Sequence, residues 1–531
     1  MSGAYDTVVI GGGHNGLVAA IYLAKAGQRV LVLERRDLLG GSAVTEEIHA
    51  DFRCDTGAHR INRIHPTVLK DLRALPAGSV RISRADPSVF TPHPEGGHLQ
   101  LWRDPHESIE AIHQWSSADA EKYPAFIKLV SDCTSLLESL YDRRPPDVLS
   151  PKRREMWETL KPVRGLRRLG KKDMIEVLRV LPMTVRELLD EWFESDILKG
   201  TLGAAGITGI CQGPMGAGTA LMFMHQHVGM QNGALRPAEF IQGGMGKLIA
   251  GLETLARQAN VEIRTGASVA GIRVEDGKAT GVVLENGDEV QAARVVSNAD
   301  PRSTFFDLLG PSQLEPEFVR AVENIRFKGV SAKVILGLDQ LPDFTCLPGD
   351  GPHLRGVISI SPSLPYLERA YDDAKYGGIS REPYLEVVIP SLADQSMAPF
   401  GKHVLSILVQ YVPYHLHEGT WDDAMRDTLA DRVVGTLSRY APNVESAVIH
   451  RHVLSPLDLE EVFSLTEGNI YHGEMTLDQL LFMRPVPGWA RYGTPVDGLY
   501  LCGAGTHPGG GVTGTPGFNA AREILREAKG K

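Results

Sequence analysis

The chain has 531 residues, more than one hydrophobic core supports, so we expect at least two domains, each able to combine separated segments. Its 43% hydrophobic and 23% charged residues are typical of a globular protein, and the net charge of −10 argues against a nucleic-acid partner. The five cysteines are scattered without a CxxC spacing, which argues against disulfides and metal sites and favours a reducing, cytoplasmic location. Four residues precede the first predicted strand and no run of 18 apolar residues occurs, so we expect neither a secretion signal nor a membrane span.

The first 35 residues have the pattern of a strand, a helix and a second strand. Residues 5–10 and 29–34 are rich in Val, Ile and Leu and predict buried strands. Residues 14–26 between them predict a helix, and Gly27 is typical of the position just after a helix end. This order predicts the βαβ unit that binds dinucleotides.

The turn between the first strand and the helix fits the pattern GxGxxG at Gly11, Gly13 and Gly16, with His14 and Asn15 inside it. In such turns the first glycine makes the bend, the second lets the backbone approach a pyrophosphate, and the third lets the helix pack on the strand. Glu34 follows Gly13 by 21 residues and ends the second strand, where its carboxylate can accept from the hydroxyls of an adenosine ribose.

A second pair of glycines, Gly40 and Gly41, follows this acidic residue, and another glycine, Gly57, follows after a short gap. Bare backbone at these positions can approach a cofactor that extends beyond the first motif. An NAD domain has no need of such a second approach, so this pattern favours FAD over NAD.

The middle of the chain differs in character. Residues 118–141 and 174–193 predict long amphipathic helices. The basic stretch from Lys152 to Lys172 lies between them and supports two interpretations, a solvated helix face or a peripheral contact with anionic lipid that would deliver an apolar substrate.

The pattern of strands and helices returns from about residue 240. Residues 247–258 predict a helix and residues 261–264 a strand, and a later helix is expected at residues 421–440. A mixed sheet with helices on one side is expected from the β-rich runs 331–338, 356–361, 385–389 and 404–411.

The strongest motif lies at the C-terminus. A strand at residues 498–502 leads into a glycine-rich loop and a final helix, for which Thr515 is the predicted N-cap and Pro516 the first helical residue. Glycines at a strand end let a ribityl chain lie on bare backbone, and the helix N-terminus favours the negative charge of a reduced flavin.

These motifs, in this order, resemble the phytoene desaturase family, nearest the branch of carotenoid ketolases and the pyridine nucleotide-disulfide oxidoreductase domain-containing protein 2 group. The resemblance covers nearly the whole chain and is most specific at its two ends. Two departures stand out: Ser42 replaces the Arg that many desaturases have after the double glycine, and no redox cysteine pair exists. The motifs that carry the resemblance are GHNGLV at residues 13–18, DPSVF at 86–90, ELLDEWF at 187–193, QGGMG at 242–246, VVSNADP at 295–301, GNIYHGE at 468–474 and GAGTHPGGG at 503–511.

The resemblance implies an α/β fold with non-covalently bound FAD. A Rossmann-like domain of the two-dinucleotide-binding type would combine residues 1–70, 231–310 and 481–531. A discontinuous α+β substrate domain would combine the helical residues 71–230 with the mixed sheet and helices of residues 311–480. The resemblance does not determine whether the chain forms an oligomer.

The motifs and the resemblance together imply a set of cofactor-binding residues. Val269 would meet the adenine, Ala58, His59 and Arg60 would lie near the isoalloxazine, and the C-terminal glycines would hold the ribityl chain. The full set is Gly11, Gly13, His14, Asn15, Gly16, Glu34, Arg35, Gly40, Gly41, Ser42, Ala43, Gly57, Ala58, His59, Arg60, Val269, Asn298, Ala299, Gly503, Ala504, Thr506, Gly514, Thr515 and Pro516.

Histidines are the candidates for proton transfer, since their ordinary pKa lies near neutrality. His59, His472 and His507 belong to motifs expected to border the flavin, and His225 and His227 lie near a predicted domain junction. The alternative for each histidine is a structural role in bracing a loop. A metal site at His225 and His227 is not expected, because no acidic or cysteine cluster accompanies them.

Three functions remain open. The first is a desaturase, saturase, ketolase or isomerase that transfers a hydride between flavin N5 and a polyene- or isoprenoid-like substrate. The second is an oxidase of an amine or another small polar molecule. The third is a flavin-binding partner protein with little turnover. Apolar walls around the substrate would favour the first function, and an arginine aimed at a carboxylate would favour the second.

Overall fold

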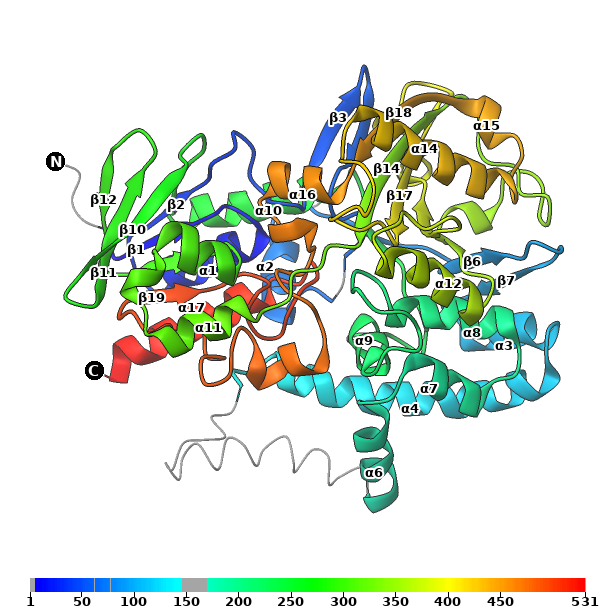
Figure 1. Cartoon of the computed structure of the whole chain (residues 1–531), viewed down its shortest axis with the longest axis horizontal. Helices are drawn as coiled ribbons and strands as arrows, with labels where there is room; N and C mark the ends of the chain where they lie inside the picture. Colours follow the sequence, from blue (N-terminus) through cyan, green and yellow to red (C-terminus); the bar gives the residue numbers. More distant parts are fainter. Residues whose placement is uncertain (1–4, 62, 77, 146–169, 531) are drawn as a thin grey trace.

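The computed structural model describes residues 5–61, 63–76, 78–145 and 170–530. Two sheets organise the chain (Figure 1), one on the left of the view beside both termini and one on the right. The helices α3, α4, α7 and α8 lie below the right-hand sheet. The described residues thus form an α/β fold of two parts, one around each sheet, which meet in the middle of the molecule.

The left-hand sheet has five parallel strands, whose order β19-β13-β1-β2-β9 matches a doubly wound dinucleotide-binding topology. Its central strands are uniformly buried, as expected where helices cover both faces of a parallel sheet. The helix α1 (His14–Lys25) packs against α10 (Met245–Gln258) and α17 (Thr515–Gly530). The strands are β19 (Leu499–Leu501), β13 (Val295–Ser297), β1 (Thr7–Ile10), β2 (Val30–Leu33) and β9 (Glu262–Arg264).

The described strands also form three small sheets. They are the antiparallel sheet β10 (Val269–Glu275), β11 (Lys278–Leu284) and β12 (Glu289–Gln291), the hairpin β3 (Thr45–His49) and β4 (Phe52–Asp55), and the pair β5 (Ile82–Arg84) and β8 (Glu239–Ile241).

The right-hand sheet has seven strands in the order β18-β14-β17-β16-β15-β6-β7, antiparallel except for the parallel pair β15 and β6. It is therefore mixed, as predicted. The four predicted β-rich runs form strands to within about two residues, a normal uncertainty for element ends. The strands are β18 (Val448–Leu454), β14 (Ser331–Leu338), β17 (His403–Gln410), β16 (Tyr384–Val388), β15 (Val357–Ile360), β6 (Val89–Pro92) and β7 (His98–Leu101).

The remaining helices cover the sheets or connect the two parts. The largest hydrophobic cluster combines the seven-stranded sheet with helices of residues 105–226, and two further clusters flank the parallel sheet. The remaining α-helices are α2 (Pro66–Arg73), α3 (Pro105–His113), α4 (Ser117–Tyr141), α6 (Lys171–Val180), α7 (Val185–Trp192), α8 (Asp196–Gly203), α9 (Thr219–Gln226), α11 (Pro316–Glu323), α12 (Leu364–Lys375), α13 (Pro390–Ala393), α14 (Asp423–Ser438), α15 (Val444–Ala447) and α16 (Pro456–Phe463).

Two helix predictions need correction. Residues 174–193 form two helices, because Pro182 interrupts the first and Thr184 begins the second with a capping box to Glu187. Helix α17 starts at Thr515 itself, and the Thr513 hydroxyl accepts from its backbone N–H, so the predicted capping role of Thr515 is wrong.

Most of the basic stretch from Lys152 to Lys172 lies outside the described residues, which resume at Gly170, just before α6. Within the described residues, none of the helices combines the length and the apolar character that crossing a bilayer requires.

A buried arginine ties the loop before the last strand to the C-terminal glycine motif. Arg484 is 2% exposed, and its guanidinium donates to the carbonyls of Ala504 at 2.9 Å, Glu474 at 3.1 Å and Gln479 at 3.2 Å. It also donates to the carbonyls of Tyr471 and Gly473. Burial lowers the pKa of Arg484 to about 10, so the side chain stays charged at neutral pH.

We expect Arg484→Met to lower the free energy of unfolding by at least about 3 kcal/mol, because several buried carbonyls lose their donor. Urea unfolding followed by circular dichroism measures this change. The matched substitution Arg355→Met, at an exposed position, should leave the unfolding midpoint nearly unchanged. Equal midpoints for both variants would contradict the role assigned to Arg484.

Candidate active site

A cavity of about 440 Å³ lies where the carboxyl ends of β1, β2 and β13 face the seven-stranded sheet. Ligands of doubly wound folds bind at this edge of the parallel sheet. The expected residues that line the cavity are Gly11, Gly13, His14, Asn15, Glu34, Arg35, Gly40, Gly41, Ser42, Gly57, Ala58, His59, Arg60, Val269, Asn298, Ala299, His472 and Ala504.

The first glycine turn has the geometry that its sequence predicts. Gly11 has a φ of +92°, which side chains rarely adopt. A Cβ on Gly13 would lie 2.7 Å from Nδ2 of Asn298, and one on Gly16 would lie 2.2 Å from the Gly11 carbonyl oxygen. Gly16 therefore packs α1 on β1 and does not line the cavity, and α1 directs its N-terminus at the cavity.

Glu34 is buried at the end of β2 and holds the turn with both carboxylate oxygens. Oε2 accepts from the Gly12 N–H at 2.7 Å and Oε1 accepts from the Arg36 N–H at 2.9 Å. Each oxygen keeps a further lone pair, so the side chain can still accept from sugar hydroxyls.

The second glycine pair lies against the first. Gly40 forms a bridge with Gly13, and its N–H donates to the Gly12 carbonyl at 3.0 Å. A Cβ on Gly57 would lie 2.1 Å from the Ser42 carbonyl oxygen, so this glycine permits the close crossing that brings His59 and Arg60 to the cavity.

Helix α16 covers one end of the cavity, which the sequence did not predict. Arg35 donates to the carbonyls of Glu461 at 2.9 Å and Val462 at 2.7 Å, and the Arg36 guanidinium lies 5.4 Å from the centre of the Phe463 ring. Val269 lines the cavity from the neighbouring sheet. The enclosed end beside Glu34 thus combines apolar walls with backbone groups, which suits an adenine.

The C-terminal motif contributes mainly by packing. Ala504 lines the cavity, while a Cβ on Gly503 would lie 2.7 Å from the Asn298 carbonyl oxygen. The expected residues that do not line the cavity are Gly16, Ala43, Gly503, Thr506, Gly514, Thr515 and Pro516.

A polar row crosses the seven-stranded sheet where it faces the cavity. Lys333 on β14 pairs with Leu408 on β17, and Leu408 pairs in turn with Glu386 on β16. Directly opposed residues share one face of a sheet, so these side chains form one row, and all three line the cavity. Sequence reasoning predicted the strands but missed Lys333 and Glu386, although a charged residue inside an otherwise apolar strand is a recognisable signal.

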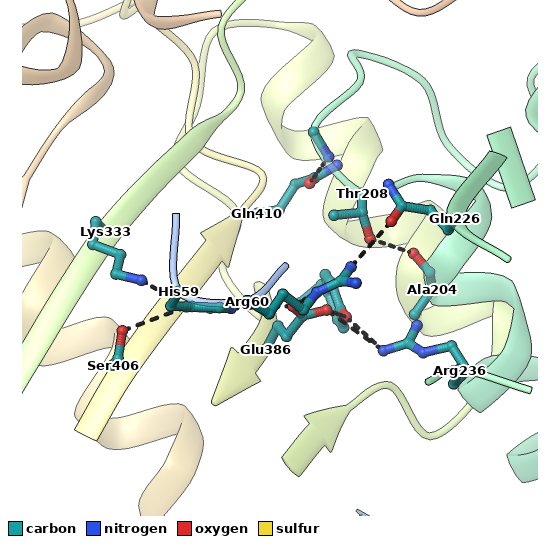
Figure 2. A network of polar contacts seen from close by, with 12 residues as sticks. His59, Arg60, Ala204, Thr208, Gln226, Arg236, Lys333, Glu386, Ser406 and Gln410 are labelled. Atoms are coloured by element: carbon teal, nitrogen blue, oxygen red, sulfur yellow. Dashed lines mark hydrogen bonds and ion pairs between the residues drawn. The ribbon is translucent and has the colours of Figure 1, made fainter. Parts of the chain in front are cut away.

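His59 links the two ends of this row (Figure 2). Its Nδ1 lies 2.6 Å from Nζ of Lys333, and its Nε2 lies 3.1 Å from Oε1 of Glu386. An ammonium can only donate, so Nδ1 accepts from Lys333 and the ring proton on Nε2 is donated to Glu386. Glu386 therefore fixes the tautomer of His59.

Two arginines complete the network around Glu386. Nε of Arg60 donates to Oε1 at 2.7 Å, and Nη2 of Arg236 lies 3.5 Å from Oε2. Arg60 also donates to Oε1 of Gln226 at 3.2 Å, and the Tyr384 hydroxyl donates to Glu386 at 3.1 Å. Figure 2 shows Arg60 and Arg236 approaching the Glu386 carboxylate from different elements.

Burial and neighbouring charges set the protonation of the network. Burial lowers the pKa of Lys333 to about 8, although Cys54, Asp55 and Glu386 oppose the shift. Burial, followed by the charge on Lys333, lowers the pKa of His59 to about 4, so the imidazole is neutral at pH 7. Burial would raise the pKa of Glu386, but Arg60 and the hydrogen bond from His59 hold it well below its usual range.

The other candidate histidines divide between the cavity and the packing. His472 lines the cavity, whereas His507 does not: its Nε2 lies 3.1 Å from the Leu140 carbonyl oxygen on α4. His225 contacts the Tyr141 hydroxyl, and both ring nitrogens of His227 contact backbone atoms. Among the described residues, His, Cys, Asp and Glu side chains form no metal-binding group of three.

The polar atoms of the cavity fit a flavin nucleotide. His14 Nε2, Asn15 Oδ1 and His472 Nδ1 belong to cavity-lining residues and are buried without a partner in the protein. Such atoms are costly unless a bound group satisfies them. Together with the glycine turns and Glu34, they supply groups for a pyrophosphate, a ribityl chain and a sugar.

Comparisons with known proteins agree with this architecture. The rat pyridine nucleotide-disulfide oxidoreductase domain-containing protein 2 is 36% identical over 546 residues, covering 99% of this chain and 94% of the relative. A phytoene desaturase of Fusarium fujikuroi is 26% identical, covering 98% of this chain and 88% of that protein. The structure of cyclohexylamine oxidase from Brevibacterium oxydans has a TM-score of 0.58 at 14% identity, over 99% of this chain and all of that one, which is a likeness of fold alone.

The predicted resemblance, fold class and enzyme class are thereby confirmed. The model of the family described as flavin containing amine oxidoreductase matches residues 16–525. The chain belongs to this family and is a flavin-dependent oxidoreductase.

Proposed function

We propose that this chain is an FAD-dependent dehydrogenase that oxidises an organic substrate bearing a polar group beside the reacting carbon, and that it binds FAD non-covalently. Bound FAD supplies a two-electron acceptor whose N5 takes a hydride. The observation that carries the proposal is Lys333, a buried lysine in the polar row that faces the cavity.

Lys333 is suited to receive the proton that leaves the substrate with the hydride. Because its pKa is about 8, about a tenth of the side chains are neutral amines at pH 7. His59 Nδ1 accepts from the lysine and so keeps its nitrogen in place beside the cavity. Lys333 is therefore the proposed general base and His59 the positioning residue. A proton-transfer role for His59 itself stays open but is disfavoured by its low pKa, and none is proposed for His507.

The walls of the cavity bear on the choice of substrate. The related phytoene desaturase is named for an apolar substrate. In this chain the cavity wall includes Lys333, Glu386, Arg60 and Gln226. These groups pair with one another and with His59, and a hydrocarbon beside them would gain no hydrogen bond from the charged wall. This lining favours the small polar substrates of the second open function over a polyene. The excess of basic over acidic groups in the network also disfavours a cationic amine.

The direct test is anaerobic mixing of the FAD-loaded protein with substrate classes. Loss of the flavin's visible absorption with oxygenated acids or alcohols, and not with terpene hydrocarbons or alkylamines, is the expected result. Reduction by hydrocarbons alone would contradict the proposal. A stable flavin that none of these compounds reduces would favour a partner protein with little turnover.

We expect Lys333→Met to slow flavin reduction by about 100-fold or more, the usual effect of losing a general base. In the unsubstituted protein the rate should rise with pH and level off above about pH 8, because deprotonation of Lys333 supplies the base. The variant should lose this rise. Lys122→Met, an exposed lysine, is the control and should keep both rate and pH profile. A persistent rise in Lys333→Met would assign the base elsewhere.

Glu34→Ala should weaken FAD binding by about tenfold to 100-fold, since charge-assisted hydrogen bonds to the sugar are lost. Titration of the apoprotein with FAD, followed by quenching of flavin fluorescence, gives the dissociation constant. The exposed Glu47→Ala in the neighbouring hairpin serves as the charge-matched control. Unchanged affinity in Glu34→Ala would remove Glu34 from the proposed site.

Acid precipitation of the FAD-loaded protein should leave all flavin in the supernatant. The described residues that line the cavity include no cysteine, so we expect no thioether to the flavin. Burial also raises the pKa of the nearby Cys54 to about 12. Absorbance of pellet and supernatant measures the partition, and a yellow pellet would refute non-covalent binding.

A further inference from the structure

The proposed flavin cavity reaches the surface at the end beside Glu34. Among its described lining residues, the exposed ones are Arg35, Asp307 and Ser464. Arg35 contacts α16, which ends just before Ser464, and Asp307 lies in a short helix that contacts β10. These elements surround the proposed adenine end, so bound FAD would occupy that opening. A substrate therefore needs another route to Lys333.

A second, smaller cavity of about 50 Å³ adjoins the buried end of the flavin cavity. We call it the side passage. Its wall includes Arg103 and Gln231, which are exposed, so the passage reaches the surface. Arg60 and Gln226 line both cavities. The side passage therefore leads from the surface toward the polar row.

A hydrogen bond lies across the boundary between the two cavities (Figure 2). Nη2 of Arg60 donates to Oε1 of Gln226 at 3.2 Å. The orientation of the Gln226 amide follows from its other end, where Nε2 donates to the Tyr471 hydroxyl at 3.1 Å. That hydroxyl donates in turn to the Thr208 carbonyl at 3.0 Å. The amide oxygen therefore faces Arg60, and the two side chains close the boundary.

The two neighbours of Gln226 are held by contacts of their own. Nε of Arg60 donates to Glu386 at 2.7 Å. The Tyr471 ring lies against Gly510, where a Cβ would lie 2.1 Å from Cδ1 of the ring. Gln226 is a neutral side chain on the last residue of α9. Rotation of this side chain to another rotamer would open the boundary while the ion pair of Arg60 stays intact.

Ion pairs fix the outer walls of the side passage. Arg63 lies 2.8 Å from the Asp142 carboxylate, and Arg84 lies 2.5 Å from Glu239. Arg63, Arg84 and Glu239 all line the passage. The volume of about 50 Å³ is room for about four water molecules. The passage is thus a narrow opening with fixed walls, which admits compact molecules and disfavours long or branched ones.

We propose that the substrate reaches Lys333 through the side passage, and that Gln226 opens and closes it and so determines the size of substrate that enters. This inference rests on the proposed function, which it deepens by restricting the substrates to compact molecules. Rotation of the Gln226 amide admits the substrate. The restored hydrogen bond to Arg60 then separates the reacting carbon from bulk water.

The test measures access to the flavin without a substrate. The FAD-loaded protein is reduced anaerobically by light with EDTA and then mixed with 2,6-dimethyl-1,4-benzoquinone or the bulkier 2,6-di-tert-butyl-1,4-benzoquinone. Each quinone takes two electrons and two protons from the reduced flavin and its surroundings, and the returning flavin absorption gives the rate. We expect the small quinone to react at least about tenfold faster than the bulky one. A changed flavin potential would alter both rates in the same direction, so their ratio reports the width of the route.

Two substitutions at Gln226 should act in opposite directions. Gln226→Ala removes the side chain that closes the boundary and should raise the rate with the bulky quinone at least about fivefold relative to the small one. Gln226→Glu keeps the shape and makes a stronger, charge-assisted bond to Arg60, so it should slow both quinones about threefold or more. The added negative charge by itself would make the reduced flavin easier to oxidise, so slowing cannot come from the charge. Unchanged rates in either variant overturn the role of Gln226, and the other variant decides if one fails to fold.

A bulky side chain at the mouth locates the route. Gln231→Trp should slow both quinones about fivefold or more. Gln114→Trp makes the same exchange at an exposed position outside both cavities and should keep both rates. Equal rates in these two variants overturn the side passage as the route. That failure leaves the proposed function standing, because the quinones do not test Lys333, and a failure of the Lys333→Met prediction leaves the quinone result intact.

Discussion

The active-site arrangement depends on one buried carboxylate, that of Glu386, and on the positive groups gathered around it. A carboxylate removed from water is costly unless charges and hydrogen bonds replace its hydration. Arg60 and His59 come from the loop after β4, whereas Arg236 comes from the segment before β8. Their hydrogen bonds and ion pairs with Glu386 therefore connect these segments to the seven-stranded sheet, and the cavity lies between the two parts. Removing any one of them would leave the others imperfectly paired.

The sequence predicted the features that are local. Gly11, Gly13 and Gly57 each serve a turn or a close crossing that short-range pattern identifies, and strands with continuous apolar residues were located closely. The row of Lys333 and Glu386 could not be predicted in the same way. It depends on the register of β14 and β16 against β17, which local pattern leaves undetermined. The α16 cover over the cavity likewise depends on tertiary packing, through contacts of Arg35 more than 400 residues away.

The same network explains why a lysine and not a histidine is suited to act as base. The positive charge of Lys333 is one cause of the low pKa of His59, and burial is the larger one. Burial also lowers the pKa of Lys333. Because the ordinary pKa of lysine is much higher than that of histidine, the lowered value is about 8, close to the pH at which a base works. Sequence reasoning favoured histidines because of their ordinary pKa. In this cavity equal burial moves histidine away from neutrality and lysine toward it.

The polar row also bears on how this fold could accommodate different substrates. The strands of the seven-stranded sheet position their side chains by register, so a change at two positions of one row alters the wall of the cavity without altering the fold. With leucine at both ends of the row, Leu408 would continue an apolar surface suited to a polyene. With Lys333 and Glu386, the same surface carries charges that His59, Arg60 and Arg236 already pair, and a hydrocarbon beside them would gain no polar contact. Substrate class in this chain is therefore expected to follow from the row, while the flavin turns at the opposite edge of the cavity stay the same.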